Sequence, residues 1–157
     1  MLEAGKPYNI SPAGPSLIRR LEHGIRNYGQ DVRLDNNPYE VGLGFAVDLN
    51  QEADFVGKES LTQIKKEGLK KKLVGIEFGT ERMKGWNEDY WPVIENDKQI
   101  GQVTTAAYSP SLKKNIGYAM LPIERTEIGT KITILARGDE TGATVIKEPF
   151  VRGREKQ

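Results

Sequence analysis

The chain has 157 residues, enough for one ordinary domain or two small ones that share an interface. Hydrophobic residues make up 37% and charged residues 29%, a balance typical of a folded globular protein and not of a disordered one. The 23 Lys and Arg nearly match the 22 Asp and Glu, so no overall charge attracts nucleic acid or an anionic membrane.

Several classes of site and location are excluded by what the sequence lacks. It has no cysteine, which excludes disulfides, thiolate catalysis and cysteine-ligated metals. With His23 as the single histidine, we predict neither a metal site nor a catalytic histidine. No apolar stretch approaches the roughly 20 residues of a membrane helix, and the first residues show no signal-peptide pattern. We therefore expect a cytoplasmic protein without nucleic-acid or membrane partners.

The N-terminal part of the chain is predicted to be helical. Ser16 can cap a helix that follows the turn-rich residues 6–15. Residues 17–28 have apolar side chains at helical spacing that share one face: Leu17, Ile18, Leu21, Ile25 and Tyr28. Gly29 is expected to end this helix, because glycine readily adopts the left-handed conformation that closes many helices.

A second helix is predicted further along the chain. Turn-forming residues at 35–38 precede a glycine-rich apolar stretch, residues 39–49, to which the sequence assigns no element. Residues 58–69 again have helical spacing, and Leu61 and Ile64 are expected to face a core.

The hydrophobic period changes from helical to alternating after the lysine run at 70–72. Six short strands are predicted, over residues 73–78, 91–95, 100–104, 116–120, 131–135 and 143–146. Gly, Asn and Asp lie between them, which favours a small barrel or sandwich. The chain is therefore expected to have an α+β organisation, divided into residues 1–69 and residues 70–157.

The first predicted helix carries a charged group that could bind a ligand: Arg19, Arg20, Glu22 and Arg26. An arginine such as Arg20, held on a packed helix, suits a planar carboxylate because its guanidinium donates two parallel hydrogen bonds. A solvated charged helix face explains the same residues, and from spacing alone that interpretation is favoured.

Three other motifs carry weaker signals. Trp86, Tyr90 and Trp91 could stack on a flat ligand or grip a methylated cation, although plugging one end of a barrel is the favoured role. Residues 113–115, Lys-Lys-Asn, could receive an anionic group, but polar turn chemistry explains them adequately. The Gly-Leu-Gly of residues 42–44 lacks the strand-then-helix setting of a dinucleotide motif.

Short motifs follow one another in a recognisable order over nearly the whole chain. Two of the clearest are Arg20-Leu21-Glu22-His23-Gly24 and Asn37-Pro38-Tyr39-Glu40-Val41-Gly42-Leu43. Others lie at residues 4–8, 28–31, 54–61, 101–104, 109–116 and 149–151. In this order they resemble the glycine-cleavage T-protein family, the folate-dependent aminomethyltransferases.

The resemblance implies a fold, a cofactor and a missing part. Family members hold tetrahydrofolate in a central hole between three domains, and their catalytic aspartate lies in the N-terminal domain, upstream of this sequence. By resemblance, Arg20 helps to hold the folate and Glu22 has a supporting, orienting role. Residues 1–69 would complete the folate-binding α+β domain, and residues 70–157 would form a six-stranded antiparallel β-barrel. The chain would then have no catalytic residue of its own and would need the N-terminal half of the same protein.

Two departures bear on which branch of the family is most similar. Residues 12–17 lack the Arg-Asp pair that T-proteins usually carry before the arginine helix, and residues 151–157 lack their tyrosines. Residues 20–24, 36–40 and 64–72 resemble the dimethylsulfoniopropionate demethylases, which move a methyl group from a sulfonium to tetrahydrofolate. The branch that maintains iron–sulfur clusters is excluded, because its cysteine motif is absent.

The first hypothesis is therefore the C-terminal part of a tetrahydrofolate-dependent methyltransferase that demethylates dimethylsulfoniopropionate or a related small methyl donor. An aminomethyltransferase of the glycine-cleavage type is the enzyme alternative. A non-catalytic folate- or partner-binding module is the alternative of another class. A front segment that exposes apolar side chains would point to missing partner structure and count against this last alternative.

Overall fold

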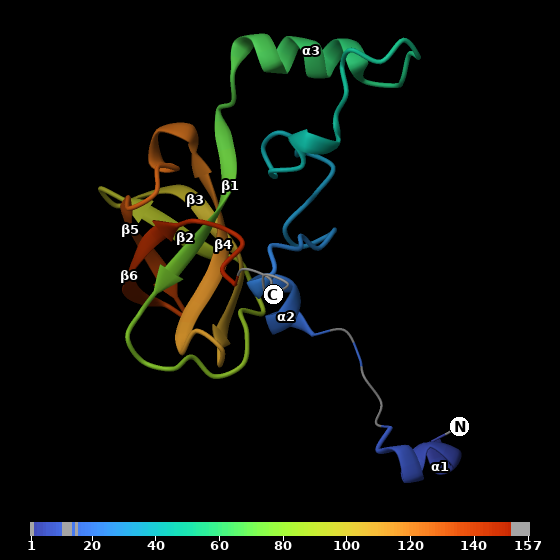
Figure 1. The fold of residues 1–157 in the computed structure, drawn as a ribbon. Helices are drawn as coiled ribbons and strands as arrows, with labels where there is room; N and C mark the ends of the chain where they lie inside the picture. Colours follow the sequence, from blue (N-terminus) through green and yellow to red (C-terminus); the bar gives the residue numbers. More distant parts are fainter. Residues whose placement is uncertain (1, 11–13, 15, 152–157) are drawn as a thin grey trace.

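The computed structural model describes residues 2–10, 14 and 16–151. Figure 1 shows a β-barrel with the N-terminal part of the chain extending from one side of it. That part contains three short helices and two 3-10 turns: α1 (Leu2–Gly5), η1 (Lys6–Tyr8), α2 (Leu17–Glu22), η2 (Gly44–Ala46) and α3 (Lys58–Glu67).

Six antiparallel strands form the closed barrel, which confirms the predicted fold class. They are β1 (Lys71–Phe78), β2 (Trp91–Glu95), β3 (Lys98–Ser109), β4 (Lys114–Pro122), β5 (Lys131–Ala136) and β6 (Asp139–Ile146), with the 3-10 turn η3 (Ile123–Arg125) after β4. Their order around the barrel is β1-β4-β3-β2-β5-β6, and β6 pairs back with β1. The predicted bounds of β2 match, whereas β3 and β4 extend further in both directions than their apolar centres indicated.

Two apolar clusters organise the molecule, one inside the barrel and one on its outer surface. The inner cluster includes Val93, Ile134 and Trp91, whose ring meets Phe78 edge-on at a centroid distance of 5.9 Å. The outer cluster joins Leu21 of α2 to side chains of β3 and β4, among them Tyr118. The outer cluster therefore attaches the front of the chain to the barrel.

The first helix is shorter than predicted, and the expectation that it reaches Tyr28 is wrong. It ends at Glu22, because Gly24 adopts a φ of 78° and reverses the chain. The Gly24 amide donates to Leu21 and the Ile25 amide donates to Arg20, the paired bonds of a Schellman motif. Ile25 and Tyr28 are consequently 57% and 68% exposed and do not continue the apolar face.

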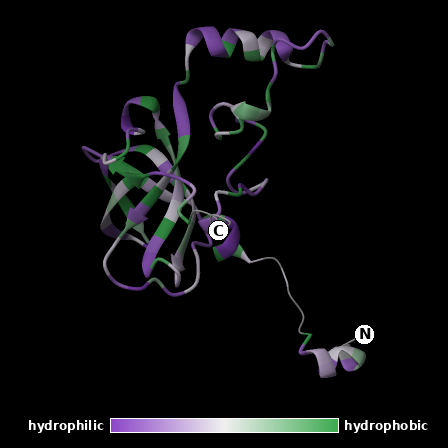
Figure 2. Cartoon of the chain, in the orientation of Figure 1, coloured by the Kyte–Doolittle hydropathy of each residue, from purple (hydrophilic) through white to green (hydrophobic). Residues whose placement is uncertain are grey.

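The stretch from residue 42 to residue 70 lies away from the barrel, as Figure 1 shows, and none of its side chains is buried. We refer to residues 42–70 as the arm. Phe45 is 87% exposed and Val56 is fully exposed, and Figure 2 shows hydrophobic residues at η2 on this part of the chain. Within this chain α3 has no buried residue, so the expectation that Leu61 and Ile64 face a core is wrong. Periodicity predicted the helix correctly but could not show whether a core lies beside it.

A membrane-crossing helix is not found among the described residues, in which no helix combines sufficient length with an apolar surface.

Close contact between β3 and β4 predicts a strong effect at Gly117. A Cβ atom there would lie inside van der Waals contact of the Thr105 carbonyl oxygen, whereas a Cβ at Gly142 of β6 would meet nothing within 4 Å. We expect Gly117→Ala to lower the free energy of unfolding by about 1–3 kcal/mol because the backbone must move. Gly142→Ala is the matched control and should be neutral or slightly stabilising. Urea denaturation of both variants checks this, and equal effects would contradict it.

Candidate functional site

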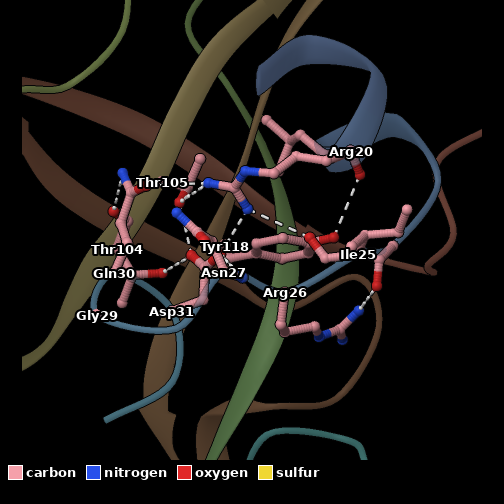
Figure 3. Close-up of polar contacts among 12 residues, drawn as sticks. Arg20, Ile25, Arg26, Asn27, Gly29, Gln30, Asp31, Thr104, Thr105 and Tyr118 are labelled. Atoms are coloured by element: carbon pink, nitrogen blue, oxygen red, sulfur yellow. Dashed lines mark hydrogen bonds and ion pairs between the residues drawn. The ribbon is translucent and has the colours of Figure 1, made fainter. Parts of the chain in front are cut away.

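A buried carboxylate lies where the front of the chain meets the barrel. Asp31 is 1% exposed, and four groups donate hydrogen bonds to its two oxygens. Oδ1 accepts from the hydroxyls of Thr104 at 2.8 Å and Thr105 at 2.5 Å. Oδ2 accepts from the Asn27 amide at 2.9 Å and from Nη1 of Arg20 at 2.6 Å. Figure 3 shows these groups converging on Asp31 from α2, the following loop and β3.

An irregularity in β3 allows both threonines to reach the same oxygen. Consecutive side chains of a regular strand point to opposite faces, so Thr104 and Thr105 would normally separate. The pairing of β3 with β4 shifts by one residue between Val103 and Thr105, as at a β-bulge. Both hydroxyls therefore point to the side on which the front of the chain lies. At the same bulge the Thr104 carbonyl accepts from the side chains of Gln30 and Asn87, each at 3.2 Å.

Arg20 is held by acceptors within the chain. Besides Asp31, its Nη1 donates to the Ile25 carbonyl at 3.2 Å. Its Nη2 donates to Gln30 Oε1 at 3.0 Å and to Thr105 Oγ1 at 3.1 Å. All four Nη hydrogens thus have acceptors, of which only Asp31 is charged. The Arg20 side chain is 16% exposed.

Glu22 lies on the side of α2 that faces the barrel. It is 5% exposed, and its carboxylate accepts a short hydrogen bond from the Ser109 hydroxyl at the end of β3. The Ser109 hydroxyl in turn accepts from the Leu112 amide at 3.1 Å. Glu22 therefore connects α2 to the β3–β4 turn, whereas Arg20 connects the same helix to the middle of β3.

The last described residues, 147–151, cross the end of α2 and form a strap. The Val151 amide donates to the Glu22 carbonyl at 3.0 Å, and the Phe150 ring packs on Tyr118 at a centroid distance of 5.8 Å. Tyr118 is fully buried, donates to the Leu21 carbonyl at 3.2 Å and has Arg26 over its ring. Burial raises the pKa of Tyr118, and the nearby Arg26 lowers it only in part.

Glu148 of the strap forms a charged pair with Arg26. Nη2 of Arg26 is 2.6 Å from Oε2 of Glu148, and both side chains are less than one-fifth exposed. At this distance the opposite charges of Arg26 and Glu148 attract each other. Burial raises the pKa of Glu148, while Arg26 opposes the rise.

The predicted site residues are only partly brought together. Arg20 and Glu22 lie on one helix but contact different parts of β3. His23 is exposed, and among the described contacts its side chain bonds to the Arg19 carbonyl through Nδ1. Trp91 is buried in the barrel core, whereas Trp86 is 57% exposed, so the three aromatics do not form one plug.

Sequence reasoning missed the two acids that fix this region, Asp31 and Glu148. Their partners, Arg20 and Arg26, are separated from them by 11 and 122 residues, spacings that no local pattern reveals. It also treated Asn115 as turn polarity, although this side chain is 5% exposed. Asn115 bonds to the Phe78 and Glu81 carbonyls and to the Met83 amide, and so fixes the loop after β1.

The buried pair of Arg20 and Asp31 predicts a large loss of stability on removing one partner. Asp31→Asn leaves the Arg20 charge without a counter-ion in a largely buried place, and we expect a loss of about 3–5 kcal/mol in the free energy of unfolding. The exposed pair of Arg33 and Asp35, 3.5 Å apart, provides the control. Asp35→Asn should cost less than about 1 kcal/mol. Chemical denaturation of both variants measures the difference, and similar small losses would refute the importance of the buried pair.

Comparison with known proteins places this geometry in context. Residues 71–152 match the family described as the glycine cleavage T-protein C-terminal barrel domain. Aminomethyltransferases of Geobacillus sp. (strain WCH70) and Bacillus subtilis (strain 168) are 43% and 38% identical over 154 residues, covering 97% of this chain and 42% of each relative. The crystal structure of the glycine cleavage system aminomethyltransferase T from Bartonella henselae superimposes with a TM-score of 0.75 at 26% identity, covering 84% of this chain and 37% of that one.

Proposed function

Because the chain belongs to the glycine cleavage T-protein family through its C-terminal barrel domain, we propose that it is the C-terminal part of a tetrahydrofolate-dependent one-carbon transferase. The chain spans about two-fifths of the length of the curated relatives, which cover it almost completely. This coverage, together with the family match of the barrel, is the observation that carries the proposal. In it, the N-terminal half of the same protein supplies the catalytic carboxylate.

The exposed arm supports a larger protein over a stand-alone module. Residues 42–70 contain no buried side chain, although Phe45 and Val56 are apolar and largely or fully exposed. Apolar side chains gathered on one extended segment are costly in water and usually mark a surface that another structure covers. We propose that the N-terminal half covers the arm, with residues 1–69 completing the α+β domain.

The surroundings of Arg20 fit a ligand that carries a carboxylate. A depression of about 500 Å³ beside α2 is lined by Arg19, Arg20 and His23 together with the apolar Leu17 and Ile25. Two arginines beside apolar surface suit the carboxylate end of tetrahydrofolate. When bound, this cofactor would accept the one-carbon unit.

For a ligand carboxylate to bind its Nη2 hydrogens, Arg20 must exchange partners. Its Nη2 hydrogens donate to Gln30 and Thr105, which are neutral acceptors. A ligand carboxylate can replace these neutral acceptors, while Asp31 keeps its place on Nη1. Glu22, buried against Ser109, fixes α2 beside the ligand and has an orienting role in this proposal.

Aminomethyl transfer is the reaction that the comparisons support best. The similar proteins of Geobacillus, Bacillus pumilus and Bacillus subtilis are each named aminomethyltransferase. The motifs at residues 20–24, 36–40 and 64–72 favour demethylation of dimethylsulfoniopropionate, and we retain that reaction as the second candidate. Both reactions deliver a one-carbon unit to the same cofactor and differ in the donor.

Donor assays on the full-length parent test the proposed function. We expect methylene-tetrahydrofolate from an aminomethylated lipoyl carrier, and no product from the 157-residue chain alone. Methyl-tetrahydrofolate formed from dimethylsulfoniopropionate, without reaction of the carrier, would instead establish demethylation. Activity of the isolated chain with either donor would contradict the proposal that the N-terminal half supplies the catalytic carboxylate.

The proposed contact of Arg20 with folate is tested by Arg20→Lys in the parent protein. Lysine keeps a positive charge beside Asp31 but cannot offer the guanidinium fork to a second carboxylate. We expect tetrahydrofolate affinity to fall by about tenfold, the loss of one charge-assisted hydrogen bond. Calorimetry measures the affinity, and Arg33→Lys on the exposed loop is the control. Unchanged affinity in a folded Arg20→Lys variant would show that Arg20 does not contact the cofactor.

A further inference from the structure

A second depression lies at the junction of the front and the barrel, and it adjoins the proposed folate site at Gln30. Its volume is about 540 Å³. The loop over residues 30–36, the start of β1, the first half of β3 and the end of β4 line it. The backbone of Lys70 is fixed at its edge, because its carbonyl accepts from the Ile123 amide at 3.0 Å. We call this depression the junction groove.

The junction groove carries an excess of positive charge. Arg33, Lys70 and Lys71 line it, and so does Asp35, which forms an exposed ion pair with Arg33 at 3.5 Å. Asp31 also lies in the wall, but Arg20 neutralises it at 2.6 Å. Outside the lining, Glu40 reaches Lys71 only at 4.0 Å, a weak attraction. Lys70 is exposed and has no acidic partner among the described ion pairs.

The positive charge continues along the chain from the groove into the arm. Lys65 and Lys66 occupy the last turn of α3, and both are exposed. The acid of that turn, Glu67, accepts from Gln63 at 2.7 Å. In this chain by itself, an anionic chain lying in the groove would therefore meet further lysines beyond its end. Such a run suits an extended ligand with several negative charges better than a single small anion.

The floor of the groove adds groups that can both donate and accept. The Gln102 side chain lines it without a hydrogen bond among the described contacts, and the Gln99 side chain uses only its amide nitrogen, on the Gly101 carbonyl. Gly101 itself presents backbone with no side chain. A peptide chain offers both N–H and C=O groups to such a surface, whereas a phosphodiester chain only accepts.

We propose that the junction groove binds an extended, peptide-like chain bearing several carboxylates, with Lys70, Lys71 and Arg33 as the cationic contacts. The side-chain amide of Gln102 and the side-chain carbonyl of Gln99 pair with the backbone of this acidic segment. The proposal does not depend on the reaction of the parent enzyme, because neither Arg20 nor the depression beside α2 takes part in it.

Binding of a fluorescein-labelled hexaglutamate peptide to the whole chain, followed by anisotropy, tests the proposal. We expect saturable binding that weakens as salt rises. Lys70→Glu combined with Lys71→Gln should weaken it about tenfold or more, since both cationic contacts are lost and the charge at residue 70 is reversed. Lys113→Glu combined with Lys131→Gln makes the same change of net charge at exposed lysines outside the groove lining, and should leave affinity within about twofold.

Three outcomes would overturn the proposal. They are the absence of saturable hexaglutamate binding, equal losses in the two double variants, and tighter binding of a labelled hexathymidylate, which would make the groove a site for nucleic acid. Circular dichroism of each variant confirms folding. Should the groove variant fail to fold, Lys65→Gln combined with Lys66→Gln on the exposed turn of α3 serves instead. That pair should weaken hexaglutamate binding about threefold, and no loss would contradict the proposed path.

Discussion

The buried carboxylate of Asp31 determines how the front of this chain sits on its barrel. A carboxylate removed from water is unfavourable unless donors and a counter-charge surround it. Here the donors come from three places far apart in sequence: α2, the loop that contains Asn27, and the two threonines of β3. Satisfying one carboxylate therefore fixes the helix, the loop and the strand relative to one another. The bulge in β3 is part of the same arrangement, because only the shifted register turns both hydroxyls to one side.

The strap provides a second attachment at the other end of α2. Residues 147–151 follow the last barrel strand and return to the helix, with Phe150 on Tyr118 and Glu148 beside Arg26. The two attachments hold residues 16–41 firmly, and the last buried side chain of the front is Val41. Beyond it the arm has no comparable contact. The structure thus contains a part packed on the barrel, which carries Arg20 and Glu22, and a part whose apolar residues have no core in this chain.

How far the sequence predicts this molecule depends on the range over which each feature is encoded. Alternating hydrophobicity is local, and it located all six strands, with β2 matched at both ends. The end of α2 is also encoded locally, but the sequence has two glycines, Gly24 and Gly29, that could each end the helix. The helical pattern continued to Tyr28, whereas the backbone turned at Gly24, where the Schellman bonds close the helix five residues earlier than Gly29. The partners of Arg20 could not be predicted, because Thr105 lies 85 residues away and depends on a bulge that leaves no clear pattern. The arm shows another limit of prediction from sequence. Its helix α3 has the periodicity of a packed helix but packs on no surface in this chain.

The central claim is that this chain is one part of a larger transferase whose other half covers the arm. Amide hydrogen exchange followed by mass spectrometry, on the chain alone and on the full-length parent, tests it most directly. The account predicts rapid exchange over residues 42–70 in the isolated chain and strong protection of the same residues in the parent. Exchange in the barrel strands should be slow in both. Equally rapid exchange of the arm in the two proteins, or an arm already protected in the isolated chain, would contradict the account.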